Sequence, residues 1–200
     1  MATPRMKSQE RKIQITQAAL TLLSSQGVAS MTMERTARLV GLAPSALYRH
    51  FKNKAEMLDA VLDLLDGQFT MEIRDAREKG GNILDTLHYF LMVRVRYIME
   101  NRSIPRLLYS EEIMYRFPEQ QLKINSMLKR FIQGIQEIVE EGQAQGVLRT
   151  DISPVETAVM FIGLFKPVDE IYDLIGGQFD IVDHVHKVWT IFRDAIAVKN

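Results

Sequence analysis

The sequence predicts an all-α protein of about nine helices, in which a small three-helix head precedes a larger helical domain. Apolar residues recur three and four positions apart along most of the chain, as they do on one face of a helix. Glycines and prolines stand between these periodic segments, where helices start and stop. No segment of useful length alternates apolar and polar residues as a half-buried strand would.

The head is expected to contain three short helices, over residues 15–26, 32–40 and 44–50. The first has one apolar face and is followed by Gly27, a residue that readily takes the left-handed conformation of a helix end. The Thr32 hydroxyl can cap the second helix. Pro44 suits the first turn of the third, where a backbone N–H is not required.

A long fourth helix is expected from Asn53 to Lys79. Asn53 and Glu56 have the spacing of a capping box, and Gly80 with Gly81 ends the helix. Apolar periodicity predicts the remaining helices over residues 83–101, 104–114, 118–143, 154–174 and 180–198.

Composition limits the compartment and the chemistry. A chain of 200 residues with 46% apolar content can form one large domain or two smaller ones with a real core. The absence of cysteine excludes disulfides and thiol catalysis and fits a cytoplasmic protein. Ala158–Phe165 and the other apolar stretches are too short to cross a membrane, and the N-terminus lacks the apolar run of a signal peptide.

The charge is divided unevenly along the chain although its sum is zero. Residues 1–54 carry nine Lys/Arg against two acids, a net of +7, whereas residues 55–200 carry sixteen against twenty-three, a net of −7. Such asymmetry suggests that the first part meets a polyanion. We therefore expect two domains, residues 1–54, completed by the start of the fourth helix, and residues 55–200.

The second and third helices have the spacing of a helix-turn-helix. Ala37 is small where two helices cross, and Gly41 permits a tight turn. The second helix of the motif is anchored by Leu42, Leu47 and Phe51. Its other face presents Ser45, Ala46, Tyr48 and Arg49. Small residues followed by long polar ones suit a helix that enters the major groove of double-stranded DNA, and the Arg49 guanidinium fork matches guanine.

Residues 18–58, and above all Leu47–Lys54, resemble the TetR family of transcriptional regulators. The resemblance implies phosphate contacts by Thr32, Tyr48, His50 and Lys54, and base contacts by Pro44, Ser45 and Arg49. It also implies a symmetric dimer with a small-molecule pocket in the larger domain. Two positions depart from the family pattern, because Ala43 replaces a frequent hydroxyl cap and Ala46 replaces a frequent phosphate-binding threonine.

Other interpretations of the head remain open at this point. The three helices could form a generic helical core, and His50 could be an ordinary surface histidine. The basic residues ahead of the first helix could be a DNA-contacting arm or a solvated tail; these residues are Arg5, Lys7, Arg11 and Lys12.

Methionine and aromatic residues are frequent in the middle of the chain, as in a cavity that adapts to apolar ligands. The candidate pocket residues are Tyr89, Met92, Arg94, Tyr97, Met114, Phe131, Phe161 and Phe165. Plain core packing is the alternative for each of them. A buried Arg94 or Arg96 would need an anionic partner, either a protein carboxylate such as Glu111 or Glu112 or an acidic ligand.

The last two expected helices are too apolar for a single buried face, which indicates a dimer interface. The candidate interface residues are Phe161, Val185, Trp189 and Phe192. Burial inside the monomer is the alternative.

No metal site, cofactor or enzyme activity is expected. His184 and His186 are two positions apart, about 200° around a helix, so they cannot share one metal ion. Glycine-rich phosphate loops and nucleophile motifs are also missing.

The sequence thus predicts a cytoplasmic homodimeric regulator that binds operator DNA, acts as a repressor and is released by an apolar or amphipathic ligand. The alternative is a nucleoid or division factor on the same scaffold without an inducer. Ligand, operator and target genes stay open, as does activation in place of repression.

Overall fold

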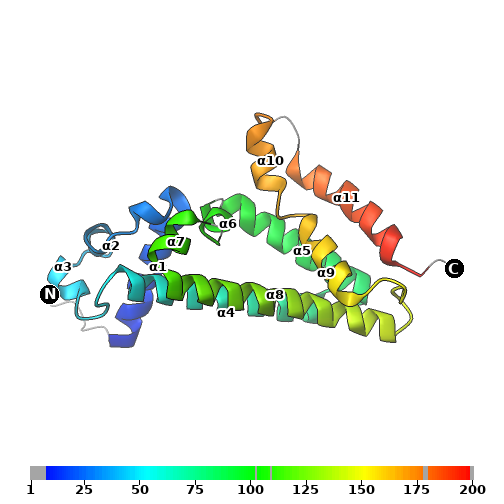
Figure 1. Cartoon of the computed structure of the whole chain (residues 1–200), viewed down its shortest axis with the longest axis horizontal. Helices are drawn as coiled ribbons and strands as arrows, with labels where there is room; N and C mark the ends of the chain where they lie inside the picture. The colour runs from blue at the N-terminus through cyan, green and yellow to red at the C-terminus, as the bar shows by residue number, and fades with distance from the viewer. Residues whose placement is uncertain (1–7, 102, 109, 178–179, 199–200) are drawn as a thin grey trace. The chain divides into compact units, whose positions relative to one another are not determined.

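The structure is a computed structural model that describes residues 8–101, 103–108, 110–177 and 180–198. In these ranges the regular structure is helical throughout, and the one extended pairing is an isolated antiparallel bridge between Leu148 and Ala197 (Figure 1). The expected all-α fold class is confirmed. No helix in the described ranges has the length and apolar content needed to span a membrane.

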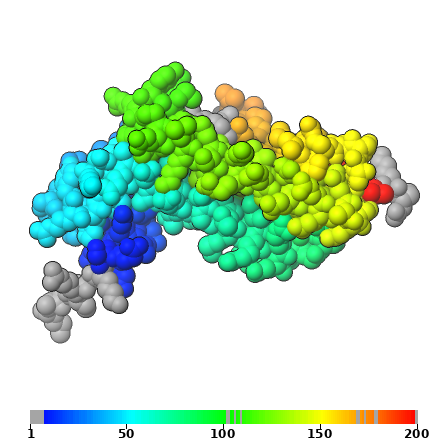
Figure 2. Space-filling view, turned by 60° about the horizontal axis from the view of Figure 1, so that its bottom comes forward, coloured from blue at the N-terminus to red at the C-terminus, as the bar shows by residue number. Residues whose placement is uncertain are grey.

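One compact unit runs up to Gly67 and also includes Asn101–Asn125. It contains α1 (Ser8–Gln26), the 3₁₀ turn η1 (Val28–Ser30), α2 (Met33–Leu39), α3 (Pro44–Leu47), α6 (Ser103–Leu108), α7 (Glu111–Arg116) and the first parts of α4 (Lys54–Lys79) and α8 (Pro118–Ala144). Figure 2 shows the green segment around α7 lying against the cyan start of α4. The unit therefore extends beyond residue 54, because α4 and the 101–125 segment complete its core.

The core of this first unit is built where α1 meets α6 and the helix-turn-helix. Ile15, Ala19 and Leu23 on α1 are buried, as are Ile104 and Leu107 on α6. Burying large apolar side chains of this kind stabilises the fold by roughly 1.5–3 kcal/mol each. Three short helices alone bury too little surface for a stable head, and α4 and α6 supply the missing cover.

The second compact unit consists of Gln68–Glu100 and Ser126–Asn200. It contains the remainders of α4 and α8 together with α5 (Ile83–Glu100), α9 (Pro154–Gly163), α10 (Val168–Leu174) and α11 (Ile181–Ile196). Its core is a cluster of tilted and stacked phenylalanine rings with centroids 5.1–6.4 Å apart, formed by Phe69, Phe90, Phe131, Phe161, Phe165 and Phe192.

Two of the expected helices are each divided in the described chain. Residues 104–114 form α6 and α7, because the backbone at Ser110 is extended (φ −72°, ψ 124°). Residues 154–174 form α9 and α10, separated by a turn that contains Pro167, which cannot donate a backbone hydrogen bond. The helical segments themselves lie where periodicity predicts them.

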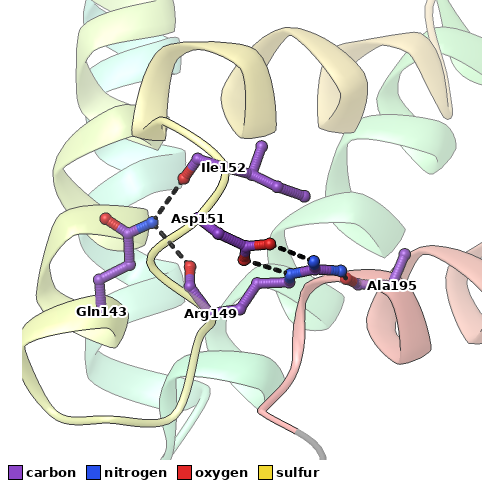
Figure 3. Close-up of polar contacts among 5 residues, drawn as sticks. All are labelled: Gln143, Arg149, Asp151, Ile152 and Ala195. Carbon is purple, nitrogen blue, oxygen red and sulfur yellow. Dashed lines mark hydrogen bonds and ion pairs between the residues drawn. The ribbon is translucent and has the colours of Figure 1, made fainter.

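The end of α11 is fastened to the loop between α8 and α9 (Figure 3). Arg149 pairs with Asp151 and donates from Nη1 to the carbonyl oxygen of Ala195 at 3.2 Å. The amide of Gln143 on α8 donates to the carbonyl oxygens of Arg149 and Ile152, both at 2.8 Å. These bonds, together with the bridge next to them, hold the last helix of the second unit at its C-terminal end.

Candidate nucleic-acid interface

The turn between α2 and α3 has the geometry that the sequence predicts. Gly41 takes a left-handed conformation (φ +69°), which a residue with a Cβ resists. The following N–H of Leu42 donates to the carbonyl oxygen of Ala37 at 2.8 Å and closes the end of α2. Ala37 itself is fully buried. The two helices of the motif are therefore held by a specific local backbone structure.

The buried side of α3 anchors the motif in the first unit. Leu47 and Phe51 are fully buried, whereas Pro44, Ser45 and Arg49 are exposed. Tyr48 exposes 48% of its surface. An apolar underside thus presents the predicted base-contacting residues and Tyr48 to solvent, as a helix that enters a DNA groove requires.

The regular part of α3 is shorter than the expected 44–50. It ends at Leu47, after which Arg49 N donates to Ala46 O at 3.3 Å and His50 N donates to Leu47 O at 2.8 Å. These are bonds of the tighter three-residue type, so residues 48–50 continue the helix as a turn. Arg49 and His50 therefore lie at the end of α3 and not within it.

Thr32 caps α2 as expected. Its side-chain oxygen accepts a hydrogen bond from the backbone N–H of Arg35 at 3.2 Å. Because a hydroxyl can accept and donate at once, this cap leaves its proton for an anionic partner. His50, by contrast, is half-buried.

Lys54 is turned into the first unit, away from the surface that the prediction gave it. Its Nζ donates to Val28 O at 2.8 Å, lies 3.4 Å from a Glu112 carboxylate oxygen and sits 5.6 Å above the Phe117 ring. Three internal interactions therefore hold the ammonium group where the sequence prediction assigned a phosphate. The phosphate contact of Lys54 stays a prediction, and it would require the ammonium group to leave these internal partners.

The cap at the start of α4 differs in one detail from the expected capping box. The Asn53 side chain accepts from Glu56 N at 2.9 Å, but the Glu56 carboxylate reaches back to Lys52 N at 2.7 Å. The Lys52 side chain is exposed. It was absent from the predicted contacts, although its position directly after the recognition helix and its charge were visible in the sequence.

The basic residues at the N-terminus do not behave as one segment. Arg5 and Lys7 lie outside the described residues. Arg11 and Lys12 belong to α1, and Lys12 lies 5.0 Å above the Phe51 ring and 3.9 Å from the Glu56 carboxylate. The helical part of the predicted arm therefore supports α3 and α4 from inside the first unit.

Arg94 is buried on α5 and paired with a carboxylate of its own chain. Its Nη1 donates to both carboxylate oxygens of Glu72, at 3.2 and 3.0 Å. Phe69 and Tyr97 flank the guanidinium, with ring centroids 4.7 and 5.0 Å away. Internal pairing is thus correct, but the partner is Glu72 on α4 and not Glu111 or Glu112. Arg96 is exposed.

The remaining pocket candidates lie in different surroundings. Phe131, Phe161 and Phe165 pack into the aromatic core. Tyr89 and Tyr97 line a surface groove of about 250 Å³ between α4 and α5, and Met92 is half-buried. Met114 belongs to the other unit and exposes 50% of its surface. Some candidates therefore belong to a packed core and others to a groove, and a ligand pocket formed by them stays a prediction.

The four predicted interface residues are buried within the single chain. Phe161 and Val185 expose 0% of their surface, Phe192 3% and Trp189 6%. The chain's own residues cover these side chains, and their role in a dimer interface stays a prediction. The outward faces of the same helices carry other apolar residues, namely Val155, Val159 and Met160 on α9 and Val182 and Ile191 on α11.

The geometry of α2 and α3 is that of a helix-turn-helix DNA-binding regulator, and comparison with known proteins gives the family. The model for bacterial regulatory proteins of the tetR family matches residues 15–61, and the model for a tetracyclin repressor-like C-terminal domain matches residues 85–165. The chain belongs to the TetR family of DNA-binding regulators.

Individual relatives differ in what their names describe. The nucleoid occlusion factor SlmA of Actinobacillus pleuropneumoniae serotype 5b is 28% identical over 134 residues, which span 66% of this chain and 64% of that protein. A TetR-family regulator from Agrobacterium tumefaciens shares the fold with a TM-score of 0.81 at 17% identity, covering 96% of this chain and all of the other. The transcriptional regulator FadR from Bacillus subtilis, solved in complex with stearoyl-CoA, has a TM-score of 0.74 at 19% identity, covering 90% of this chain and 96% of that chain.

Proposed function

We propose that this regulator is a transcriptional repressor that binds a palindromic operator as a homodimer and leaves it when a small apolar or amphipathic ligand binds. The observation that supports this most directly is the exposed face of α3, held from beneath by the fully buried Leu47 and Phe51. Operator binding requires access to the chromosome, so the proposed compartment is the cytoplasm.

Each of the other predicted contact residues has a proposed role that follows from its chemistry. The Arg49 guanidinium can donate two hydrogen bonds to guanine O6 and N7, while Pro44 and Ser45 allow close approach to the bases. The hydroxyls of Thr32 and Tyr48 and the imidazole of His50 suit phosphate oxygens. Lys54 is left out of this set because Val28 and Glu112 hold its ammonium group.

A dimer is required because one recognition helix reads too few base pairs. Two copies of α3 must lie about 34 Å apart to enter successive major grooves on one side of DNA. The outward apolar residues of α9 and α11 are the proposed contact, since Val155, Val159 and Gly163 follow one another at helical spacing on an exposed stripe.

The proposed release mechanism uses α4, which contributes residues to both compact units. A ligand that binds the second unit and favours another position of α4 would change the separation of the two recognition helices. Such a population shift needs a difference in affinity of a few kcal/mol between the two states.

The experiment is a footprint of the purified protein on DNA around its own gene, at several salt concentrations. Protection of one palindromic site, with an affinity that depends on its sequence at moderate salt, is expected. Equal affinity for unrelated duplexes would contradict the repressor function.

A second candidate is supported by the sequence match to nucleoid occlusion factors. A protein of that kind would occupy many chromosomal sites and would not need an inducer. Genome-wide mapping of occupied sites separates the two, because a repressor is expected at few promoters and a nucleoid factor at many scattered positions.

A further inference from the structure

A groove on the surface of the second unit lies between two helices that run along each other. α4 contributes Gln68, Met71, Glu72 and Asp75, and α5 contributes Tyr89, Val93 and Tyr97. The α5 residues are four positions apart, so they share one face of the helix over about two turns. With a volume of about 250 Å³, the groove holds a small organic molecule and not a peptide helix.

The floor of the groove carries a carboxylate whose charge is only partly compensated. Glu72 exposes 13% of its side chain and accepts two hydrogen bonds from the single Nη1 of Arg94. Burial raises the pKa of Glu72, and the lowering effect of Arg94 is the smaller influence. A further positive charge at this position would therefore stabilise the ionised carboxylate.

The other end of the groove already holds an ammonium group of the chain itself. Lys79 Nζ donates to the Asp75 carboxylate at 3.3 Å and sits 6.0 Å above the Tyr89 ring. The Lys79 side chain exposes 56% of its surface, so it can swing into solvent at little cost. This pair of contacts shows how a carboxylate and an aromatic face can hold a cation at this point.

We propose that the groove binds a small organic cation, an amine or quaternary ammonium compound with a flat apolar body. The positive group takes the place of Lys79 between Asp75 and Tyr89. The apolar body lies along Val93 and Tyr97, while the positive group, about one helical turn from Glu72, adds to the compensation of the Glu72 carboxylate. That this compound regulates DNA binding rests on the proposed function. Its binding to the groove can be measured without DNA and is tested separately.

Benzyltrimethylammonium serves as the probe, with benzyl alcohol as its uncharged counterpart and benzoate as its anionic one. Each is titrated at low ionic strength into protein with isotope-labelled tyrosine rings, and the Tyr89 and Tyr97 signals are assigned by single Tyr→Phe variants. Shifts of both signals with the cation alone support the proposal. Absence of shifts, or equal or stronger shifts with benzoate, overturns it in favour of an empty groove or an anion held by Arg94.

Variants test the position of the charge. Asp75→Asn and Tyr89→Leu are each expected to weaken binding about 3- to 10-fold, in line with one ionic or cation–π contact. Lys79→Ala is expected to strengthen binding several-fold, because the competing ammonium group is gone. Glu78→Gln is the matched control for Asp75→Asn, because it also removes one carboxylate from the end of α4. Glu78 lies outside the groove lining, so this variant should leave binding unchanged.

Glu72→Gln removes the floor charge but leaves Arg94 without its carboxylate, so the folded fraction is checked by circular dichroism first. Weaker binding after Lys79→Ala, or unchanged binding in both Asp75→Asn and Tyr89→Leu, would overturn the proposal. If the cation binds but does not release the protein from its operator, the groove is still a cation site. That result would contradict only the proposal that a ligand releases the repressor.

Discussion

Arg49 and Arg94 show how the two units of this protein use the same side chain differently. Arg49 stands at the end of α3 with its surface exposed, above an anchor of buried Leu47 and Phe51. Arg94 is 5% exposed, lies between aromatic rings and shares its charge with Glu72. The first arginine is open to solvent, while the charge of the second is compensated inside the fold.

The surroundings of a cationic side chain, and not its residue type, therefore decide whether it is available for binding or stabilises the fold. A buried charge costs free energy unless a partner compensates it, so its loss or the loss of its partner affects folding. An exposed charge contributes little to folding, so its loss affects binding alone. Lys54 shows that the same holds for lysine, since its ammonium group contacts Val28 O and Glu112 within its own unit.

The largest effect is expected for Arg94→Ala. Glu72 would remain in the fold without its partner, and breaking a buried pair typically costs about 3–5 kcal/mol of unfolding free energy. Urea denaturation measures this loss. Operator affinity, corrected for the folded fraction, should stay the same, and Arg96→Ala at the exposed neighbouring arginine is the control. An unchanged urea midpoint for Arg94→Ala would show that the Arg94–Glu72 pair does not stabilise the fold.

Arg49→Ala is expected to show the opposite pattern. Loss of one bidentate base contact costs about 1–3 kcal/mol of binding free energy, or roughly 5- to 150-fold in operator affinity. The urea midpoint should not move, because the side chain is exposed. Gel-shift titrations on the operator and on a duplex with one altered guanine measure the effect. Equal loss on both duplexes would indicate a phosphate contact in place of a base contact.

The sequence predicted the head well because its geometry is local. Gly41, Pro44 and Leu47 act on neighbours only a few positions away, so turn, cap and anchor could all be inferred from spacing. The helical segments could also be inferred from the sequence, because the spacing of apolar residues within each segment is enough to predict a helix. The length of α3 was overestimated, since periodicity does not distinguish a helix from the tighter turn over residues 48–50.

The second unit was predicted less well because its side chains are placed by distant parts of the chain. Trp189 and Phe192 belong to an apolar face, but only packing against α5 and α9 decides that this face turns inward. Glu72 lies 22 residues before Arg94, and no local signal identifies it as the partner. Composition alone likewise cannot separate a packed aromatic cluster from a cavity.

Gly67→Ala is expected to give a smaller effect, a gain in stability. Gly67 lies inside α4, and a Cβ built there meets nothing within 4 Å. Replacing a helix-interior glycine by alanine stabilises a helix by about 1 kcal/mol. Urea denaturation should therefore show a higher midpoint.

The matched control for Gly67 is Gly142 in α8, where neighbouring side chains decide whether an added Cβ raises or lowers the stability of the fold. A Cβ there would lie 2.6 Å from Leu148 Cδ1 and 2.7 Å from Ile83 Cγ2. Gly142→Ala is therefore expected to destabilise the protein despite its higher helix propensity. A higher urea midpoint in both variants would show that propensity outweighs packing in these helices.

The smallest effect concerns His88, which stacks on Trp189 with ring centroids 5.1 Å apart. Burial lowers the pKa of His88, as do His186 and Arg193, while Asp85 opposes them. The folded state therefore takes up this proton at lower pH than the unfolded state, whose histidine has the ordinary value near 6.5. Stability from this group is complete above pH 6.5 and is lost as the pH falls from there towards the folded-state pKa.

The measurement is the urea midpoint between pH 7.5 and 5.5, followed by the fluorescence of Trp189, the one tryptophan of the chain. The quantity compared is the difference between the wild type and His88→Phe, so that contributions common to both proteins cancel. A phenylalanine keeps the stacked ring without a proton to bind, so its midpoint should fall less on acidification. If both proteins lose stability equally, His88 is not the group responsible.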